Sequence, residues 1–217
     1  MATTDNRSLL ELAKQYAGSG IGLKIRIQGV EPGFLMHNPE SMRKQEEAAA
    51  DWATSGKRTK FIPDPKAEAE WGAYRLENGD LYLPARMIHR CLVEAGKAFK
   101  VPKQRDSFMR YVAAGVIIPQ AFGLGFPLLD PKTDEVLTSY EVDVQRVVIA
   151  RASVRRARPL LEKWAANLQL DLDPETVPPE MFAQVIGYAG QRQGVGDGRP
   201  EKGGIYGRFT VVALEVA

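Results

Sequence analysis

Hydrophobic and polar residues alternate in two stretches of the chain, which is the pattern of a strand with one buried face. In the first stretch, Leu23–Val30, apolar residues alternate with polar residues that include Lys24 and Arg26. The second stretch, Trp164–Leu172, alternates in the same way. The last residues, Arg208–Val216, are rich in β-branched side chains and also predict a strand.

Other stretches repeat apolar residues every three or four positions, which predicts amphipathic helices. One begins after Pro84, a residue that suits the first turn of a helix. A second covers Glu180–Ala189 and ends at Gly190, and a third, short helix is expected over Ser8–Tyr16. The helix after Pro84 has its apolar positions at Met87, Ile88, Cys91, Leu92, Ala95 and Phe99.

The middle of the chain gives weaker signals. Glu46–Ala53 is acidic and alanine-rich, which favours a helix, and Val116–Ile118 is a short strand candidate. The glycines of Gly123–Pro127 predict an interruption of regular structure. Asp130–Asp134 predicts a turn from which a β-ribbon projects.

Without insertions, the order of elements is strand, helix, strand, strand, helix, strand. This is the order of an α+β, ferredoxin-like (βαββαβ) fold, in which two helices pack on one face of an antiparallel sheet. We expect a single domain over residues 1–217, in which residues 31–71 form an inserted arm and residues 101–140 an inserted ribbon. The second face of the sheet is then open to a ligand.

Composition limits the function more than it defines it. The net charge of the 217 residues is only +2, so that affinity for a polyanion depends on where the charges lie. A single cysteine, Cys91, excludes an internal disulfide and favours a reducing, cytoplasmic setting. One cysteine and two histidines leave little for a metal site of the zinc type. No apolar run is long enough to predict a membrane span.

Two basic segments are candidates for contacts with phosphate groups. Arg156 and Arg158 share one face of a predicted basic strand, and Lys24 and Arg26 lie on the polar face of the first strand. If the two strands adjoin, these four cations form a track across the open sheet face. No strand carries the aromatic residues with which some RNA-binding sheets stack bases, so we expect recognition to be led by phosphate.

A glycine-rich loop precedes the last strand. It follows a helix and opens a strand, which is the reverse of a dinucleotide-binding loop, and it lacks the Gly-Lys-Ser/Thr of a P-loop. Glycines allow close approach to the backbone, whose N–H groups can bind anions, although the loop could also be a plain connector. The candidate residues are Arg192, Gly194, Gly196, Gly198, Arg199, Lys202, Gly203, Gly204, Tyr206 and Arg208.

This order of elements, with the glycine- and arginine-rich segment Gly190–Phe209 before the final strand, resembles the RAMP superfamily of CRISPR-associated proteins. The chain is also similar to small prophage proteins that have Met36-His37-Asn38 after the first strand and an Arg-Pro-Glu-Lys-Gly-Gly segment near the end. The resemblance implies a ferredoxin-like fold and a subunit that forms homo-oligomers or filaments along RNA. Other members of the superfamily cut RNA without a metal and often use a histidine.

We therefore predict a protein that binds single-stranded RNA, or less favourably DNA, without catalysis and without a cofactor, and whose affinity falls steeply with salt. Two alternatives stay open. In one, His37 serves a metal-independent endoribonuclease, for which it is the catalytic candidate. In the other, the chain is a phage structural or protein-interaction subunit that binds no nucleic acid.

Overall fold

The computed structural model describes residues 20–56, 61–101, 105–119, 124–149 and 152–216, so the helix expected over residues 8–16 lies outside the described residues. These residues form a mixed α+β fold with two antiparallel sheets. The larger sheet has the strand order β3-β5-β8-β1-β9, and a short strand, β4, pairs with β8. Its strands are β1 (Ile21–Gly29), β3 (Tyr82–Pro84), β4 (Val116–Ile117), β5 (Gly125–Leu129), β8 (Ala165–Leu172) and β9 (Phe209–Val216).

The two alternating stretches are the central strands of this sheet, as the pattern predicts. β1 and β8 pair antiparallel, with Ile25 opposite Leu168 and Lys24 opposite Gln169. Ile25 and Leu168 are buried, whereas Lys24 is exposed on the other face. One face of the sheet therefore belongs to the core and the other is polar.

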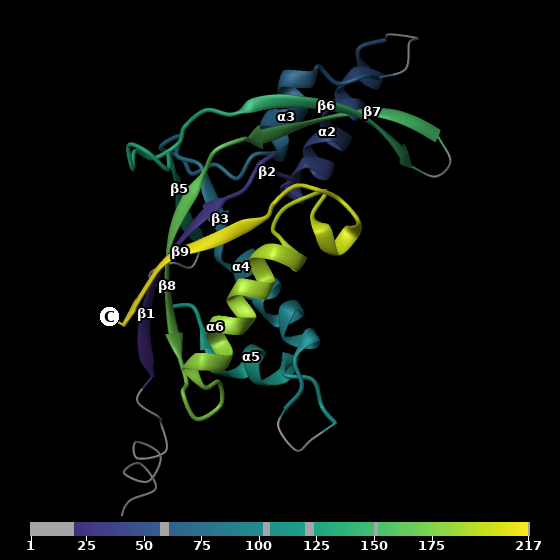
Figure 1. Ribbon diagram of the computed structural model, residues 1–217. Helices are drawn as coiled ribbons and strands as arrows, with labels where there is room; N and C mark the ends of the chain where they lie inside the picture. Colours follow the sequence, from purple (N-terminus) through teal and green to yellow (C-terminus); the bar gives the residue numbers. More distant parts are fainter. Residues whose placement is uncertain (1–19, 57–60, 102–104, 120–123, 150–151, 217) are drawn as a thin grey trace, which may run out of the picture.

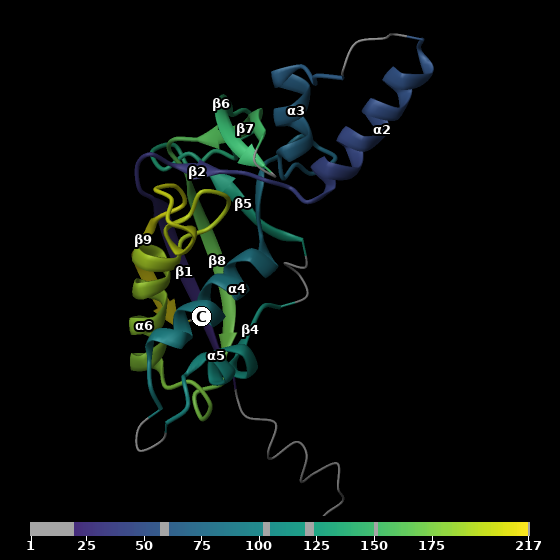
Figure 2. The same ribbon diagram turned by 90° about the vertical axis from the view of Figure 1, so that its right-hand side faces the viewer.

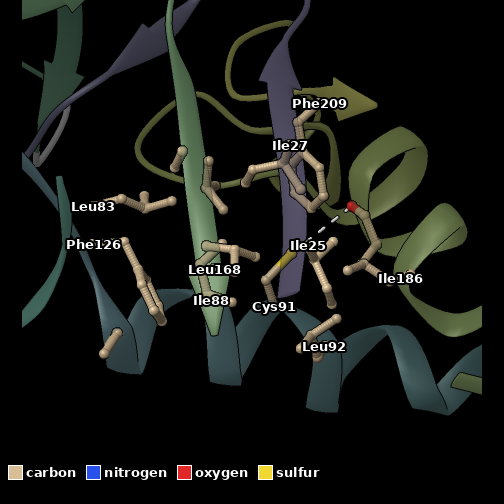
Figure 3. Packing of buried hydrophobic residues seen from close by; sticks show 14 of the residues in the cluster. Ile25, Ile27, Leu83, Ile88, Cys91, Leu92, Phe126, Leu168, Ile186 and Phe209 are labelled. Carbon is tan, nitrogen blue, oxygen red and sulfur yellow. Dashed lines mark hydrogen bonds between the residues drawn. The ribbon is translucent and has the colours of Figure 1, made fainter. Parts of the chain in front are cut away.

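Helices lie against one side of the main sheet in Figures 1 and 2, and the buried core residues are between them and the strands. Ile88, Cys91 and Leu92 point from α4 towards the strands, and Ile186 of α6 meets Ile25 of β1 (Figure 3). The helices are α4 (Ala85–Ala95), α5 (Met109–Gly115) and α6 (Pro179–Tyr188), and short η1 (Gly96–Ala98), η3 (Ala189–Gln193) and η4 (Pro200–Lys202) turns accompany them. No helix among the described residues is long and apolar enough to cross a membrane.

A second, three-stranded sheet lies at one end of the molecule (Figure 1). Its strands are β2 (Phe34–Leu35), β7 (Ala152–Leu161) and β6 (Glu141–Ile149), in the order β2-β7-β6. β6 and β7 form a long ribbon that extends past β2 (Figure 1). Two helices accompany it, α2 (Glu40–Thr54) and α3 (Pro65–Gly72), and α2 stands away from the main sheet in Figure 2.

The carboxylate of Glu68 joins α3 to the free edge of β7. Glu68 is buried, and its Oε2 accepts a hydrogen bond from the backbone N–H of Ala157 at 3.1 Å. Its Oε1 pairs with Arg156 at 3.1 Å. A side chain thus satisfies an edge N–H of β7 that β2, with two residues, is too short to reach.

The structure confirms the α+β class, the first and last strands, and the helices that follow Pro84 and Pro178. It also confirms a helix over Glu46–Ala53, which is part of α2. The interpretation of residues 101–140 as an inserted ribbon is wrong. Residues 125–127, which were expected to interrupt regular structure, are the first residues of β5. The segment 101–140 contributes Phe108, Val112, Val116, Phe126 and Leu128 to the core. The projecting ribbon is β6–β7 instead.

Candidate nucleic-acid interface

Two arginines lie directly opposite each other on the β6–β7 ribbon. Arg146 of β6 is in register with Arg155 of β7, so both side chains are on the same face, and both are exposed. Neither forms an ion pair with a carboxylate of the described residues. Like charges opposite each other destabilise a sheet, and this pair is uncompensated within the described chain.

The two arginines that the sequence singled out on this ribbon are on its other face, where both are neutralised. Arg156 pairs with Glu68 and also donates to Gln45 Oε1 at 3.1 Å. Arg158 Nε lies 2.9 Å from Asp197 Oδ2 of the glycine-rich loop. Their carboxylate partners come from distant parts of the chain, so neither of these two candidates for phosphate contacts has a free charge in this structure.

Lys24 and Arg26 do not join them. Both lie on the open face of the main sheet, whereas β7 belongs to the smaller sheet. Arg26 is itself held by Asp134, with which it forms an ion pair, and by Asn167 Oδ1 at 3.1 Å. The predicted single track of four cations does not form, because the two strands that carry them are in different sheets.

The glycine-rich loop is packed against the protein itself. Val195 is buried, and its N–H donates to the carbonyl of Gly207 at 2.9 Å. Two further N–H groups bind the segment after β1: that of Gly207 donates to Gly33 O at 2.7 Å, and that of Asp197 donates to Leu35 O at 2.9 Å. Backbone N–H groups that donate to carbonyls of the chain are those of Gly194, Val195, Asp197, Lys202, Gly203, Gly204, Tyr206 and Gly207. The idea that these amides are arranged for a polyanion is therefore wrong.

The cations of this loop are also largely engaged. Arg199 pairs with Glu201 at 2.7 Å and donates to Gly196 O, and Lys202 lies 3.5 Å from the same carboxylate. Arg208 donates to Gln191 O at 2.6 Å. The loop also contributes two carboxylates, Asp197 and Glu201, which offset part of the charge of its cations.

The remaining predicted loop residues are spread over different surroundings. The side chain of Tyr206 reaches the ribbon, where its hydroxyl accepts a hydrogen bond from Gln145 Nε2 at 2.8 Å. Arg192 is exposed at the end of η3, near Arg208 and away from the ribbon. Gly198 has a positive φ and packs beside the Tyr206 ring, whereas Gly203 and Gly204 belong to the turn after η4.

His37 lies in a cleft between α2, α3 and β7, with a volume of about 540 Å³. Desolvation in this cleft lowers the pKa of His37 below its usual 6.5, and the positive charges of Arg158 and Arg156 lower it further, against the opposing effect of Asp197. The neutral form of the imidazole is thus favoured more than in a free histidine. The cleft also brings together Arg156 and Arg158 with Glu46 and Glu68, so that the formal charges of its lining balance.

The sequence showed the arginine-rich stretch but not which of its members are unpaired. Arg146 and Arg155 are nine positions apart in the sequence and face each other only because β6 and β7 pair in this register. Their proximity therefore could not be seen from the sequence. Glu68 and Asp197, which neutralise the other face, gave no local signal. Among the described residues, no group of three or more His, Cys, Asp or Glu is arranged to hold a metal ion.

Comparison with known proteins does not supply a relative: no protein-family model matches the sequence, and no curated protein matches it significantly. The surface chemistry is therefore the guide to function.

Proposed function

We propose that this chain binds single-stranded nucleic acid, RNA in preference to DNA, through the face of the β6–β7 ribbon that carries Arg146 and Arg155. The observation that carries the proposal is this exposed pair. Holding two guanidinium groups opposite each other costs stability, and a phosphate between them would offset that cost with charge-assisted hydrogen bonds. Phosphate contacts of this kind give affinity with little sequence preference.

The arrangement of the main sheet supports the resemblance to RAMP proteins that the order of elements suggests. Four strands follow the order β5-β8-β1-β9, α4 lies between β1 and β5 in the chain, and α6 lies between β8 and β9. This is consistent with a ferredoxin-like core, from which the ribbon and α2 project. The cytoplasm, where a free thiol such as that of Cys91 persists, is the proposed site of action.

We further propose that the chain acts as a repeating subunit. β9 is the last strand of the sheet order, and among the described residues nothing pairs with its outer edge. Three apolar side chains on it are exposed, those of Val212, Leu214 and Val216. An uncovered apolar edge strand favours contact with another chain.

The second candidate is the metal-independent endoribonuclease. The lowered pKa of His37 favours it, since a general base must be unprotonated, and Arg158 lies near enough to influence this pKa. Against it, Arg158 is already paired with Asp197 and so is not available to stabilise a developing charge.

A binding titration with labelled single-stranded RNA and DNA of about 16 nucleotides tests the proposal. The double variant Arg146→Gln/Arg155→Gln should weaken binding at least about tenfold, because each charge-assisted contact contributes more than a neutral one. A matched control, Lys97→Gln/Arg110→Gln, removes the same charge near α5, at the opposite end of the molecule from the ribbon (Figure 1), and should bind like the unmodified chain.

If both double variants bind RNA equally weakly, the loss of affinity follows from net charge alone, and the ribbon is rejected as the binding site. Absence of binding by the unmodified chain at low salt would reject the function. Sedimentation of the same samples should show larger assemblies with RNA than without it. Recovery of shortened RNA from these mixtures, lost in His37→Gln, would favour the endoribonuclease instead.

A further inference from the structure

A groove lies on the face of the main sheet that the helices leave uncovered. Its volume is about 590 Å³, which is within the range of small-molecule sites. β1 and β8 form its floor, β9 lies along one side, and the end of β5 with the turn after it lies along the other. The groove is on a different sheet from the ribbon and is not part of the proposed strand-binding surface.

The side wall of this groove is fixed by an unusual local structure. Asp134 is the one non-glycine residue of the described chain with a positive φ, +60°. Asp130 holds the turn by accepting hydrogen bonds from the N–H groups of Lys132 and Thr133, and Arg26 reaches across from β1 to pair with Asp134. Residues with this backbone conformation cluster at functional sites when the surrounding structure holds them in place.

The lining combines an apolar wall with a few polar groups. Pro127, Leu129 and Val136 provide the apolar surface. On the floor, the side-chain amide of Gln169 has no hydrogen-bond partner within the part of the chain that the structure describes. Lys24 is opposite Glu215 in register, and both side chains line the groove. The structure shows no ion pair between them, so the ammonium group of Lys24 is available to a ligand.

We propose that this groove binds one nucleotide. The flat base packs on Pro127 and Val136 at the β5 side of the groove, Gln169 of the next strand, β8, binds the polar edge of the base, and Lys24 of β1 binds the phosphate. A side-chain amide presents a donor and an acceptor side by side, which is how Asn and Gln recognise base edges. Lys24 is the only cation of the groove that is not already paired within the described residues, because Arg26 is held by Asp134. A single phosphate, as a monoester or as one unit of a strand, therefore fits better than a triphosphate.

Titration with the four nucleoside 5′-monophosphates, followed by calorimetry and by ¹H–¹⁵N correlation spectra, tests this site. At least one monophosphate should bind and shift the amide signals of β1, β8 and the 130–136 turn. Lys24→Gln and Gln169→Leu should each weaken binding about tenfold, as expected for loss of one hydrogen-bonded group. The control Lys44→Gln removes an equal charge from α2 and should leave binding unchanged. The corresponding triphosphate should bind no more than about twofold tighter, because no second unpaired cation is available.

Failure of all four monophosphates to bind, or binding that Lys24→Gln and Gln169→Leu leave unchanged, would overturn the proposal. Much tighter binding of the triphosphate would also overturn it. Competition by single-stranded RNA would assign the groove to one unit of a strand, and lack of competition would assign it to a free nucleotide. Arg146→Gln/Arg155→Gln should retain monophosphate binding, so that this site and the ribbon can fail separately.

Discussion

Gly203 and Gly207 have the same backbone conformation in very different surroundings. Their φ angles are +78° and +74°, but a Cβ on Gly207 would lie 1.8 Å from Val195 O, whereas nothing is within 4 Å of a Cβ on Gly203. Gly207→Ala should therefore cost at least about 3 kcal/mol of the free energy of unfolding, and Gly203→Ala only about 1 kcal/mol from the left-handed backbone. Urea denaturation of both variants measures the difference, and equal losses would show that the close approach in the loop is not needed.

The pKa of His37 reports on the charged side chains around its cleft. Because its pKa is lower in the folded than in the unfolded chain, its contribution to stability is complete above pH 6.5 and is lost as the pH falls below that value. Arg158→Gln should raise the pKa of His37, since it removes a positive charge and leaves Asp197 unpaired. Asp197→Asn should lower the pKa of His37, since it removes a negative charge. Titration of the imidazole signals by NMR, assigned with His37→Gln, checks both directions. Shifts of the same sign in the two variants would contradict this arrangement of the cleft.

At the scale of elements, the sequence predicted those parts of the fold whose pattern is local. The alternation of apolar and polar residues predicted β1 and β8, and the apolar repeat after Pro84 predicted α4. Burial of one face of a strand or helix places apolar residues at the period of that element, so the pattern is visible in the sequence. β5 was missed, since a strand that contains Gly125 and Pro127 contradicts local propensity and is held by pairing with β3 and β8.

The candidate interface was less predictable, because the contacts that decide it are between residues far apart in the chain. Arg156 meets Glu68 across 88 positions, and Arg26 meets Asp134 across 108. Sequence alone counts these arginines as available, and the structure shows that carboxylates already neutralise them. The loop glycines were correctly seen as permitting close backbone approach, but what approaches is the chain itself, from Gly33 and Leu35.

At the scale of the whole molecule, ion pairing determines how strongly a polyanion can bind. The net charge is +2, and four of the arginines, Arg26, Arg156, Arg158 and Arg199, have carboxylate partners. A single copy therefore offers few cations on the ribbon face, and strong binding to a long strand would need many copies, each making the same small number of contacts. This fits a repeating subunit better than a monomeric high-affinity binder.

The dependence of binding on salt measures this number directly. For single strands, each phosphate neutralised changes the slope of log K against log salt by about −0.7, so Arg146 and Arg155 together predict about −1.4 for one bound copy. The steep dependence expected from the sequence is thus reduced, because the other arginines release no counterions when they are already paired. Titrations on an oligonucleotide short enough for one copy, between about 50 and about 200 mM salt, should lose only about sevenfold in affinity. Arg155→Gln should halve the slope, while Arg110→Gln leaves it unchanged. A slope near −4 for one copy would mean that the ion pairs of the other arginines open to the strand, and the ribbon pair would then not account for the binding.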